Sequence, residues 1–303
     1  MVRGGDELEA VGPWLGYDEV FFDCDSTLTA TEGIDELARL TFADTGKGMA
    51  EAIEQLTRRA MEGEVPLEEV YAERLGLLRP TREDLHWLAL RYRERAVPEA
   101  RELIAALHFL GRRVHIVSSG LSEPVVAFGN WLGVPSDCIH AVGLEFDQLA
   151  GRWWEYFQGD PNPAERYLDF VPGPLSESRG KAAVISQVRR KPGRALLVGD
   201  GVSDLLARPA VELFVGFGGV VHRERVAAGA DVYVAAASLA PILPLATCAE
   251  EYEQCRSTPH QALFDQGLAL TFQDRVTFHH PRRRESFYAS YQAFHPRSNR
   301  GAA

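Results

Sequence analysis

The sequence predicts an α/β protein built on a doubly wound parallel sheet, with a helical block inserted after the first strand. Two observations support this fold class. After Pro98, short apolar runs with strand character alternate with helical stretches, and such alternation is typical of a parallel sheet with helices on both faces. Between the first apolar run, Val20–Phe22, and Pro98, apolar residues instead recur every three or four positions, which is the helical period.

The first strand, Val20–Phe22, leads directly into Asp23-Cys24-Asp25-Ser26-Thr27. Two carboxylates two residues apart at the end of a strand share one face of it, and their repulsion favours a neutralising cation. Mg²⁺ prefers oxygen ligands and is the usual cation beside a phosphate. Taken alone, the segment is equally compatible with an acidic exit from a strand into a turn, with Thr27 as a cap.

The flanks of this strand differ in character. Residues 1–16 are rich in glycine and acidic residues, and we expect a loose leader there. From Glu32 to about Ala96 the apolar spacing predicts helices throughout, and no strand is evident. Pro66 and Pro80 mark breaks between these helices.

The rest of the chain supplies the alternating elements. In order, we expect a helix over Glu99–Leu110, a strand over Val114–Val117, a helix from Pro124 to Trp131, strands over Ile139–Phe146 and Trp153–Phe157, a helix over Gly180–Arg190, and strands over Ala195–Val198, Leu213–Val215 and Val232–Val234. The neighbouring strands on either side of 147–152 suggest a hairpin. The stretch 159–178 is rich in proline, aspartate and glycine and is expected to be a loop.

Polar residues follow two further strands, as Ser118-Ser119-Gly120 and as Gly199-Asp200-Gly201. Ligands of such sheets bind beyond the carboxyl ends of the strands, so we expect both segments to meet the double aspartate. Ser118 would offer phosphate a hydroxyl and nearby backbone N–H groups. Asp200 would add a carboxylate for a metal, with Asp204 behind it. The simpler interpretations are a helix N-cap at Ser118 and a plain turn at 199–201.

Lysine is scarce in this chain, which places arginine at nearly every other basic position. The lysines are Lys47, Lys181 and Lys191. A lysine retained at 181, at the start of a predicted helix, suggests that a compact ammonium group is needed there, as phosphate sites often require. The alternative is an ordinary solvated helix residue.

Composition excludes several classes of protein. The net charge is −11, from 43 acidic and 32 basic side chains, which argues against a dedicated nucleic-acid binder. The polar start of the chain does not resemble a signal peptide, and no apolar run approaches the roughly 18 residues of a membrane helix. Cys24, Cys138, Cys248 and Cys255 form no CxxC pair, so free thiols in a reducing cytoplasm are expected.

Taken together, these segments resemble the haloacid dehalogenase superfamily of phosphotransferases. Asp23–Thr27 is similar to its first motif, Ser118 to its second, Lys181 to its third, and Asp200 with Asp204 to its fourth, in the same order. The helical block resembles the small cap of that family, which is inserted in a Rossmann-like core. The segments that resemble the branch acting on phosphoserine are Thr31–Ala38, Leu56–Met61, Glu73–Leu75 and Gly216–Val221.

The resemblance implies a role for each matching residue. Asp23 would attack phosphorus and form an aspartyl-phosphate, while Asp25 would act as general acid and then as general base. Asp23, the backbone carbonyl of Asp25, and Asp200 would hold Mg²⁺. The remaining assignments are phosphate binding by Ser118, Ser119 and Lys181, substrate binding by Glu32, Met61, Arg74 and Ser203, and a supporting position behind the metal for Asp204.

The implied activity is Mg²⁺-dependent hydrolysis of a small phosphomonoester, with O-phospho-L-serine as leading substrate, in cytoplasmic serine biosynthesis. Two alternatives remain: another phosphorylated metabolite such as phosphohomoserine, or a non-catalytic sensor of phosphoryl ligands. The implied domains are a leader (1–16), an α/β core (17–32 and 98–246), a helical cap (33–97) and a C-terminal extension (247–303).

Some residues fall outside the resemblance. Ser119, Leu67 and Val220 stand where the family usually has glycine, an aromatic residue and asparagine. Without the resemblance, Arg74 would be a surface helix residue paired with Glu69 or Glu73.

The extension beyond residue 246 contains many large apolar side chains. Such content is too high for a disordered segment. We therefore expect it to dock on the core or on a second subunit, which allows a homo-oligomer. His279 and His280 lack a partnered ligand spacing and are interpreted as structural.

Overall fold

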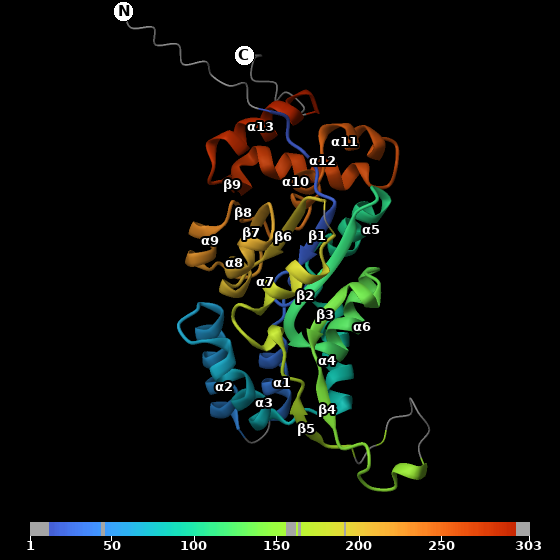
Figure 1. The fold of residues 1–303 in the computed structure, drawn as a ribbon, viewed down its shortest axis with the longest axis vertical. Helices are drawn as coiled ribbons and strands as arrows, with labels where there is room; N and C mark the ends of the chain where they lie inside the picture. The colour runs from blue at the N-terminus through green and yellow to red at the C-terminus, as the bar shows by residue number, and fades with distance from the viewer. Residues whose placement is uncertain (1–11, 44–45, 156–161, 163–164, 191, 295–303) are drawn as a thin grey trace, which may run out of the picture.

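The structure, a computed structural model, describes residues 12–43, 46–155, 162, 165–190 and 192–294 (Figure 1). In this part of the chain a seven-stranded sheet runs in the order β3-β2-β1-β6-β7-β8-β9. Its strands are β1 Glu19–Phe22, β2 Arg113–Leu121, β3 Ile139–Val142, β6 Ala195–Gly199, β7 Leu213–Phe217, β8 Val232–Val234 and β9 Val276–Phe278. All neighbours are parallel except β8 and β9. The predicted fold class is confirmed.

The order of the strands creates a switch point between β1 and β6. From β1 the chain winds outward through β2 and β3, then returns to β6 on the other side of β1. Every residue of β1, β6 and β7 is buried, which explains why these strands are continuous apolar runs in the sequence. Ligands of doubly wound sheets bind at such a switch point, outside the carboxyl ends of the strands.

The helices that follow the core strands cover the sheet (Figure 1). They are α5 Ala100–Phe109, α6 Ser122–Leu132, α7 Gly180–Val188, α8 Val202–Ala207, α9 Glu224–Gly229 and α10 Ile242–Ala246. Single 3₁₀ turns lie at Ser136–Cys138, Trp153–Glu155, Pro174–Ser176, Arg208–Ala210 and Gln292–Phe294. Among the described residues, no helix combines the length and apolar character that crossing a bilayer requires.

Four helices form the insertion after β1, as the apolar period predicted. They are α1 Gly33–Thr41, α2 Lys47–Met61, α3 Leu67–Leu78 and α4 Arg82–Glu94. Pro66 is the N-cap of α3. Thr81 begins α4 with a capping box, in which its hydroxyl accepts from the Asp84 N–H and the Asp84 carboxylate accepts from the Thr81 N–H.

Three local predictions are wrong: a strand over Trp153–Phe157, a loop over 159–178, and a helix N-cap at Ser118. The hairpin pairs β4 Leu144–Phe146 with β5 Tyr167–Phe170, whereas Trp153–Glu155 is a 3₁₀ turn and residues 156 and 157 lie outside the described part. The Phe170 ring lies 5.1 Å from the ring of Tyr71 in α3, so packing against the insertion stabilises a strand within the predicted loop. Ser118 is not a helix N-cap either, because β2 continues to Leu121, which caps α6.

The C-terminal extension packs on the core, which is the first of the two positions expected for it. It contains α11 Ala249–Cys255, α12 Gln261–Leu270, a π-type turn over Thr271–Arg275, β9 and α13 Pro281–Tyr291. β9 joins the edge of the sheet antiparallel to β8. Figure 1 places α11–α13 at the opposite end of the molecule from α1–α3.

The end of the leader is ordered against this extension. Trp14 is only 5% exposed, and its ring lies 5.3 Å from the ring of Phe287 in α13. The Trp14 indole N–H donates to the carbonyl of Leu245. The prediction of a loose leader is therefore wrong for these positions, while residues 1–11 lie outside the described part of the chain.

Candidate active site

Three carboxylates meet at the switch point of the sheet. Asp23 follows β1 and Asp200 follows the neighbouring β6, while Asp204 lies in the first turn of α8. One carboxylate oxygen from each of the three residues lies within 4.8 Å of the other two, and all three residues are buried. The parallel register of β1 and β6, with Phe22 opposite Val198, brings the first two together.

Backbone and hydroxyl donors fix the loop that carries Asp23. The Asp23 N–H donates to the Val198 carbonyl at 2.9 Å, and the Cys24 N–H donates to Asp23 Oδ1 at 2.8 Å. Thr27 does not act as a simple turn cap, because its hydroxyl donates across the site to Asp200 Oδ1 at 3.1 Å. Hydrogen bonds from this loop therefore fix the side chains of both Asp23 and Asp200.

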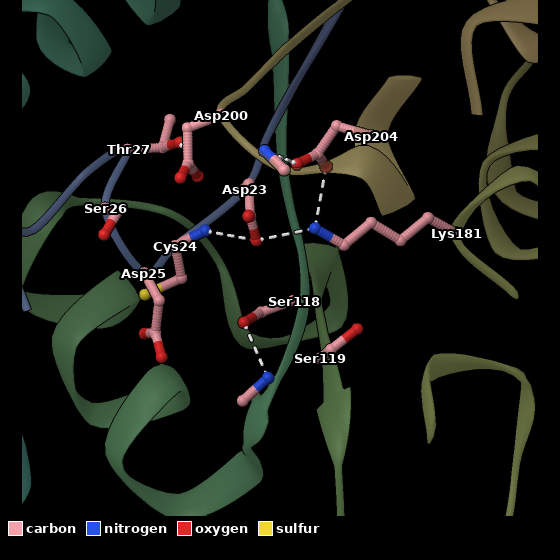
Figure 2. Close-up of polar contacts among 12 residues, drawn as sticks. Asp23, Cys24, Asp25, Ser26, Thr27, Ser118, Ser119, Lys181, Asp200 and Asp204 are labelled. Atoms are coloured by element: carbon pink, nitrogen blue, oxygen red, sulfur yellow. Dashed lines mark hydrogen bonds and ion pairs between the residues drawn. The ribbon is translucent and has the colours of Figure 1, made fainter. Parts of the chain in front are cut away.

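Lys181 lies between two of these carboxylates (Figure 2). Its Nζ is 2.9 Å from Asp23 Oδ1 and 2.7 Å from Asp204 Oδ1, and the side chain is fully buried. Burial alone would lower the pKa of Lys181, but the charges of Asp204 and Asp23 outweigh it and raise this pKa. The interpretation of Lys181 as a solvated helix residue is wrong.

The glycine before Lys181 explains how α7 begins so close to the centre. A Cβ atom at Gly180 would lie 1.5 Å from the carbonyl oxygen of Pro174, which is a severe overlap. Only glycine therefore permits α7 to start where the Lys181 ammonium reaches Asp23.

Acidic groups outnumber the basic groups that neutralise them. Burial, and then the charge of Glu32, raise the pKa of Asp25 to about 8. Burial, and then the charge of Asp23, raise the pKa of Asp204 to about 7. Burial also raises the pKa of Asp200 well above its usual value, although the Arg223 guanidinium opposes this shift.

The donor atoms of this centre suit a hard cation. Asp200 Oδ2 is buried and accepts no hydrogen bond from the described residues; its neighbour is Arg223 Nη2 at 3.2 Å. Asp25 Oδ1 also has no hydrogen-bond partner in this part of the chain. Buried carboxylate oxygens that outnumber the cationic groups around them, in an all-oxygen set, fit a divalent ion such as Mg²⁺.

A cavity of about 530 Å³ opens above the carboxylates, between the core and the helical insertion. The predicted site residues that line it are Asp23, Asp25, Glu32, Met61, Arg74, Ser118, Ser119, Lys181 and Ser203. Asp200 and Asp204 are not among its lining residues and lie beneath it. Every predicted site residue is thus brought to one place.

The two serines after the core of β2 face different directions. Ser118 is buried and its Oγ accepts from the Gly120 N–H at 2.9 Å. In Figure 2 the Ser119 hydroxyl points away from Ser118 and Asp23, as alternation along a strand requires. Tyr71 donates to the Ser119 carbonyl at 2.9 Å, so this position also contacts the helical insertion.

Arg74 comes from α3 and is 4% exposed, so its interpretation as a surface residue paired with Glu69 or Glu73 is wrong. Its Nη1 donates to Thr57 Oγ1 at 3.0 Å, and its guanidinium carbon lies 5.7 Å from the centroid of the Tyr71 ring.

Arg223 is the residue that sequence reasoning missed. Its Nη2 lies 3.1 Å from Glu32 Oε1 and 3.2 Å from Asp200 Oδ2. Ser26 also donates to Glu32 Oε1, at 2.7 Å. Arg223 is the N-cap of α9 and lies just after the resembling segment Gly216–Val221, but nothing in that segment pairs it with Glu32, and only the fold reveals that it joins Glu32 to the carboxylate centre.

The family model of haloacid dehalogenase-like hydrolases matches residues 20–207. The chain belongs to this family. The hydrolase is 34% identical to human phosphoserine phosphatase over 220 residues, which cover 72% of this chain and 88% of the relative. It is 35% identical to the chloroplastic phosphoserine phosphatase of Arabidopsis thaliana over 229 residues, or 74% and 70% of the two chains.

Solved structures of similar proteins share the fold of this hydrolase. A phosphoserine phosphohydrolase-like protein from Francisella tularensis superposes with a TM-score of 0.61 at 20% identity, over 72% of this chain and 95% of its own. A phosphoserine phosphatase solved as a phospho-aspartyl intermediate analogue gives a TM-score of 0.59 at 23% identity, over 75% and 98% of the two chains.

Proposed function

We propose that this hydrolase converts O-phospho-L-serine to L-serine through a phosphorylated Asp23. The supporting observation is that one cavity is lined by Asp23, Asp25 and Lys181 from the core and by Glu32 and Arg74 beside it. The first group suits phosphoryl transfer, and the second suits an amino-acid head with an ammonium and a carboxylate. Relatives named phosphoserine phosphatases support the same substrate.

Asp23 is the proposed nucleophile. Its carboxylate attacks phosphorus, so that an O–P bond forms at Asp23 as the bond to the serine oxygen breaks. Charge increases on the outer phosphoryl oxygens during this transfer, and positioned donors stabilise it. Lys181 and Ser118 supply such donors, and Asp204 holds the Lys181 ammonium in place at 2.7 Å.

Asp25 is the proposed general acid and base. Its pKa of about 8 keeps a proton on the carboxyl group at neutral pH, which the departing serine oxygen needs. The Gly33 N–H donates to Oδ2 at 2.8 Å and fixes the group. The resulting carboxylate then takes a proton from a water molecule that attacks the phosphorus, so that the Asp23 O–P bond breaks, inorganic phosphate leaves and the Asp23 carboxylate is restored.

Asp23, the backbone carbonyl of Asp25, and Asp200 would hold Mg²⁺ in this proposal. The buried acidic surplus supports this set, as does Asp200 Oδ2, which pairs with Arg223 but accepts no hydrogen bond from the described residues. When bound, the cation neutralises part of the negative charge shared by carboxylates and phosphoryl oxygens. In the same proposal residues 33–97 act as a cap over the core, and the enzyme works in the cytoplasm in serine biosynthesis.

Arg74→Ala tests the assignment of the substrate. A charge-assisted pair shielded from water contributes about 1.5–3 kcal/mol, so kcat/KM for phosphoserine should fall roughly ten- to a hundredfold. p-Nitrophenyl phosphate lacks the carboxylate and should lose little. Arg39→Ala, at a side chain 53% exposed on α1, is the matched control and should change neither substrate.

The two substrates separate the possible roles of Arg74. An equal loss for both would mean that Arg74 only supports the insertion. No loss for either would remove the main support for phosphoserine and favour another phosphomonoester, which a panel including phosphohomoserine would identify.

A further inference from the structure

We propose that Thr57 is a positioning residue that decides which edge of the Arg74 guanidinium meets the substrate carboxylate. The inference rests on the proposed function and names a new specificity determinant for it. Thr57 lies on α2 and Arg74 on α3, both are buried, and both line the cavity above the carboxylates.

The hydrogen-bond donors of Arg74 are only partly used. A guanidinium group has five N–H donors and binds a carboxylate with two parallel hydrogen bonds along one edge. Arg74 Nη1 donates to Thr57 Oγ1 at 3.0 Å, which commits that end of the group. Nε is buried and has no hydrogen-bond partner among the described residues. The edge formed by Nε and Nη2 is therefore the one left for a carboxylate.

Thr57 is suited to fix this choice because its own geometry is restricted. A β-branched side chain in a helix has few rotamers. The Thr57 hydroxyl donates to the carbonyl of Ile53, one turn earlier, at 3.2 Å. A guanidinium group has no acceptor, so the Thr57 oxygen meets Arg74 with a lone pair. Ile53 is fully buried, so water does not compete for the hydrogen bond between its carbonyl and the Thr57 hydroxyl.

A second cavity, of about 400 Å³, is lined by Thr57 and Asp35 but not by Arg74. Thr57 and Glu32 line both cavities. Burial raises the pKa of Asp35 to about 6, and a hydrogen bond with Thr57 and the charge of Arg74 both oppose that shift. Thr57 therefore contacts both groups, and its bond to Arg74 Nη1 holds the guanidinium at the first cavity, which Arg74 lines.

Thr57→Val keeps the shape of the side chain and removes the acceptor. O-phosphoethanolamine is the matched probe, because it has the phosphate and ammonium groups of phosphoserine but no carboxylate. KM for phosphoserine should rise roughly five- to fiftyfold, with kcat within about threefold of the parent. Both constants for phosphoethanolamine should stay within about twofold. Thr57→Ser retains the hydroxyl and should restore most of the lost affinity.

Each outcome has a distinct meaning. An unchanged KM for phosphoserine in Thr57→Val, while Arg74→Ala raises it, overturns the positioning role. Equal losses for both substrates, or no recovery in Thr57→Ser, also overturn it and leave Thr57 as a packing residue. If Thr57→Val does not fold, Thr57→Ala is held to the same criteria. A parent enzyme without preference for phosphoserine over phosphoethanolamine refutes the proposed function, and the inference with it.

Discussion

Replacement of Phe287 by alanine should destabilise the enzyme without impairing its chemistry. Phe287 is fully buried in α13, and its ring lies 5.3 Å from those of Trp14 and Phe278 and 4.8 Å from that of Tyr291. Truncating a core phenylalanine costs about 3–5 kcal/mol. At roughly 2–4 °C per kcal/mol for a chain of this size, the Tm should fall by roughly 6–20 °C.

The assay is thermal unfolding followed by circular dichroism, with kcat/KM measured well below the transition. Trp14 precedes the start of β1 whereas Asp23 follows its end, so the extension lies far from the chemistry and kcat/KM should stay within about twofold. Phe109→Ala is the matched control, because this ring is 51% exposed and its loss should shift the Tm by less than about 2 °C. A Tm of Phe287→Ala equal to that of the control would refute the structural role of this ring. A fall of tenfold or more in kcat/KM of the folded variant would refute its separation from the active site.

Two further predictions concern the core. Asp23→Asn should abolish steady-state phosphate release with an unchanged circular dichroism spectrum, since the amide keeps the shape and loses the attacking charge; activity within about tenfold of the parent would contradict this. His115 is buried against Phe21, and burial, followed by the charge of Arg113, lowers the pKa of His115 to about 4. As the pH falls, the unfolded chain takes up a proton on His115 near pH 6.5, whereas the folded chain does so only near pH 4. The stability that neutral His115 contributes is therefore complete above pH 6.5 and is lost as the pH falls toward 4. Between pH 7 and pH 5 the parent should lose about 2 kcal/mol more unfolding free energy than His115→Gln; parallel urea-denaturation results at the two pH values would exclude this contribution.

The sequence predicts the fold well where local pattern and tertiary burial agree. β1, β6 and β7 are apolar runs buried on both faces, and the four inserted helices follow a clear helical period. The hairpin is different. Trp153–Glu155 is rich in aromatic residues but forms a turn, whereas Tyr167–Phe170 becomes a strand because it pairs with β4 and packs on Tyr71.

In the candidate site, too, some features follow from local sequence and others only from tertiary packing. The spacing of Asp23, Asp25 and Asp200 at strand ends predicts that they converge, because parallel strands bring their carboxyl ends to one edge. For Arg74 the resemblance of Glu73–Leu75 already implies a place at the substrate, whereas the local charge pattern alone favours a surface residue. The contact of Arg223 with Glu32 has no such signal, because it depends on how separate helices and loops pack.

The packing of Trp14 against α13 has a consequence for biosynthesis. The Trp14 N–H donates to Ser290 Oγ, 276 positions further along the chain, and Ser286 donates back to the Gly12 carbonyl. During translation, the indole and the start of β1 emerge long before the helix that covers them. Until α13 is made, this aromatic surface has no partner to cover it and stays exposed on the nascent chain.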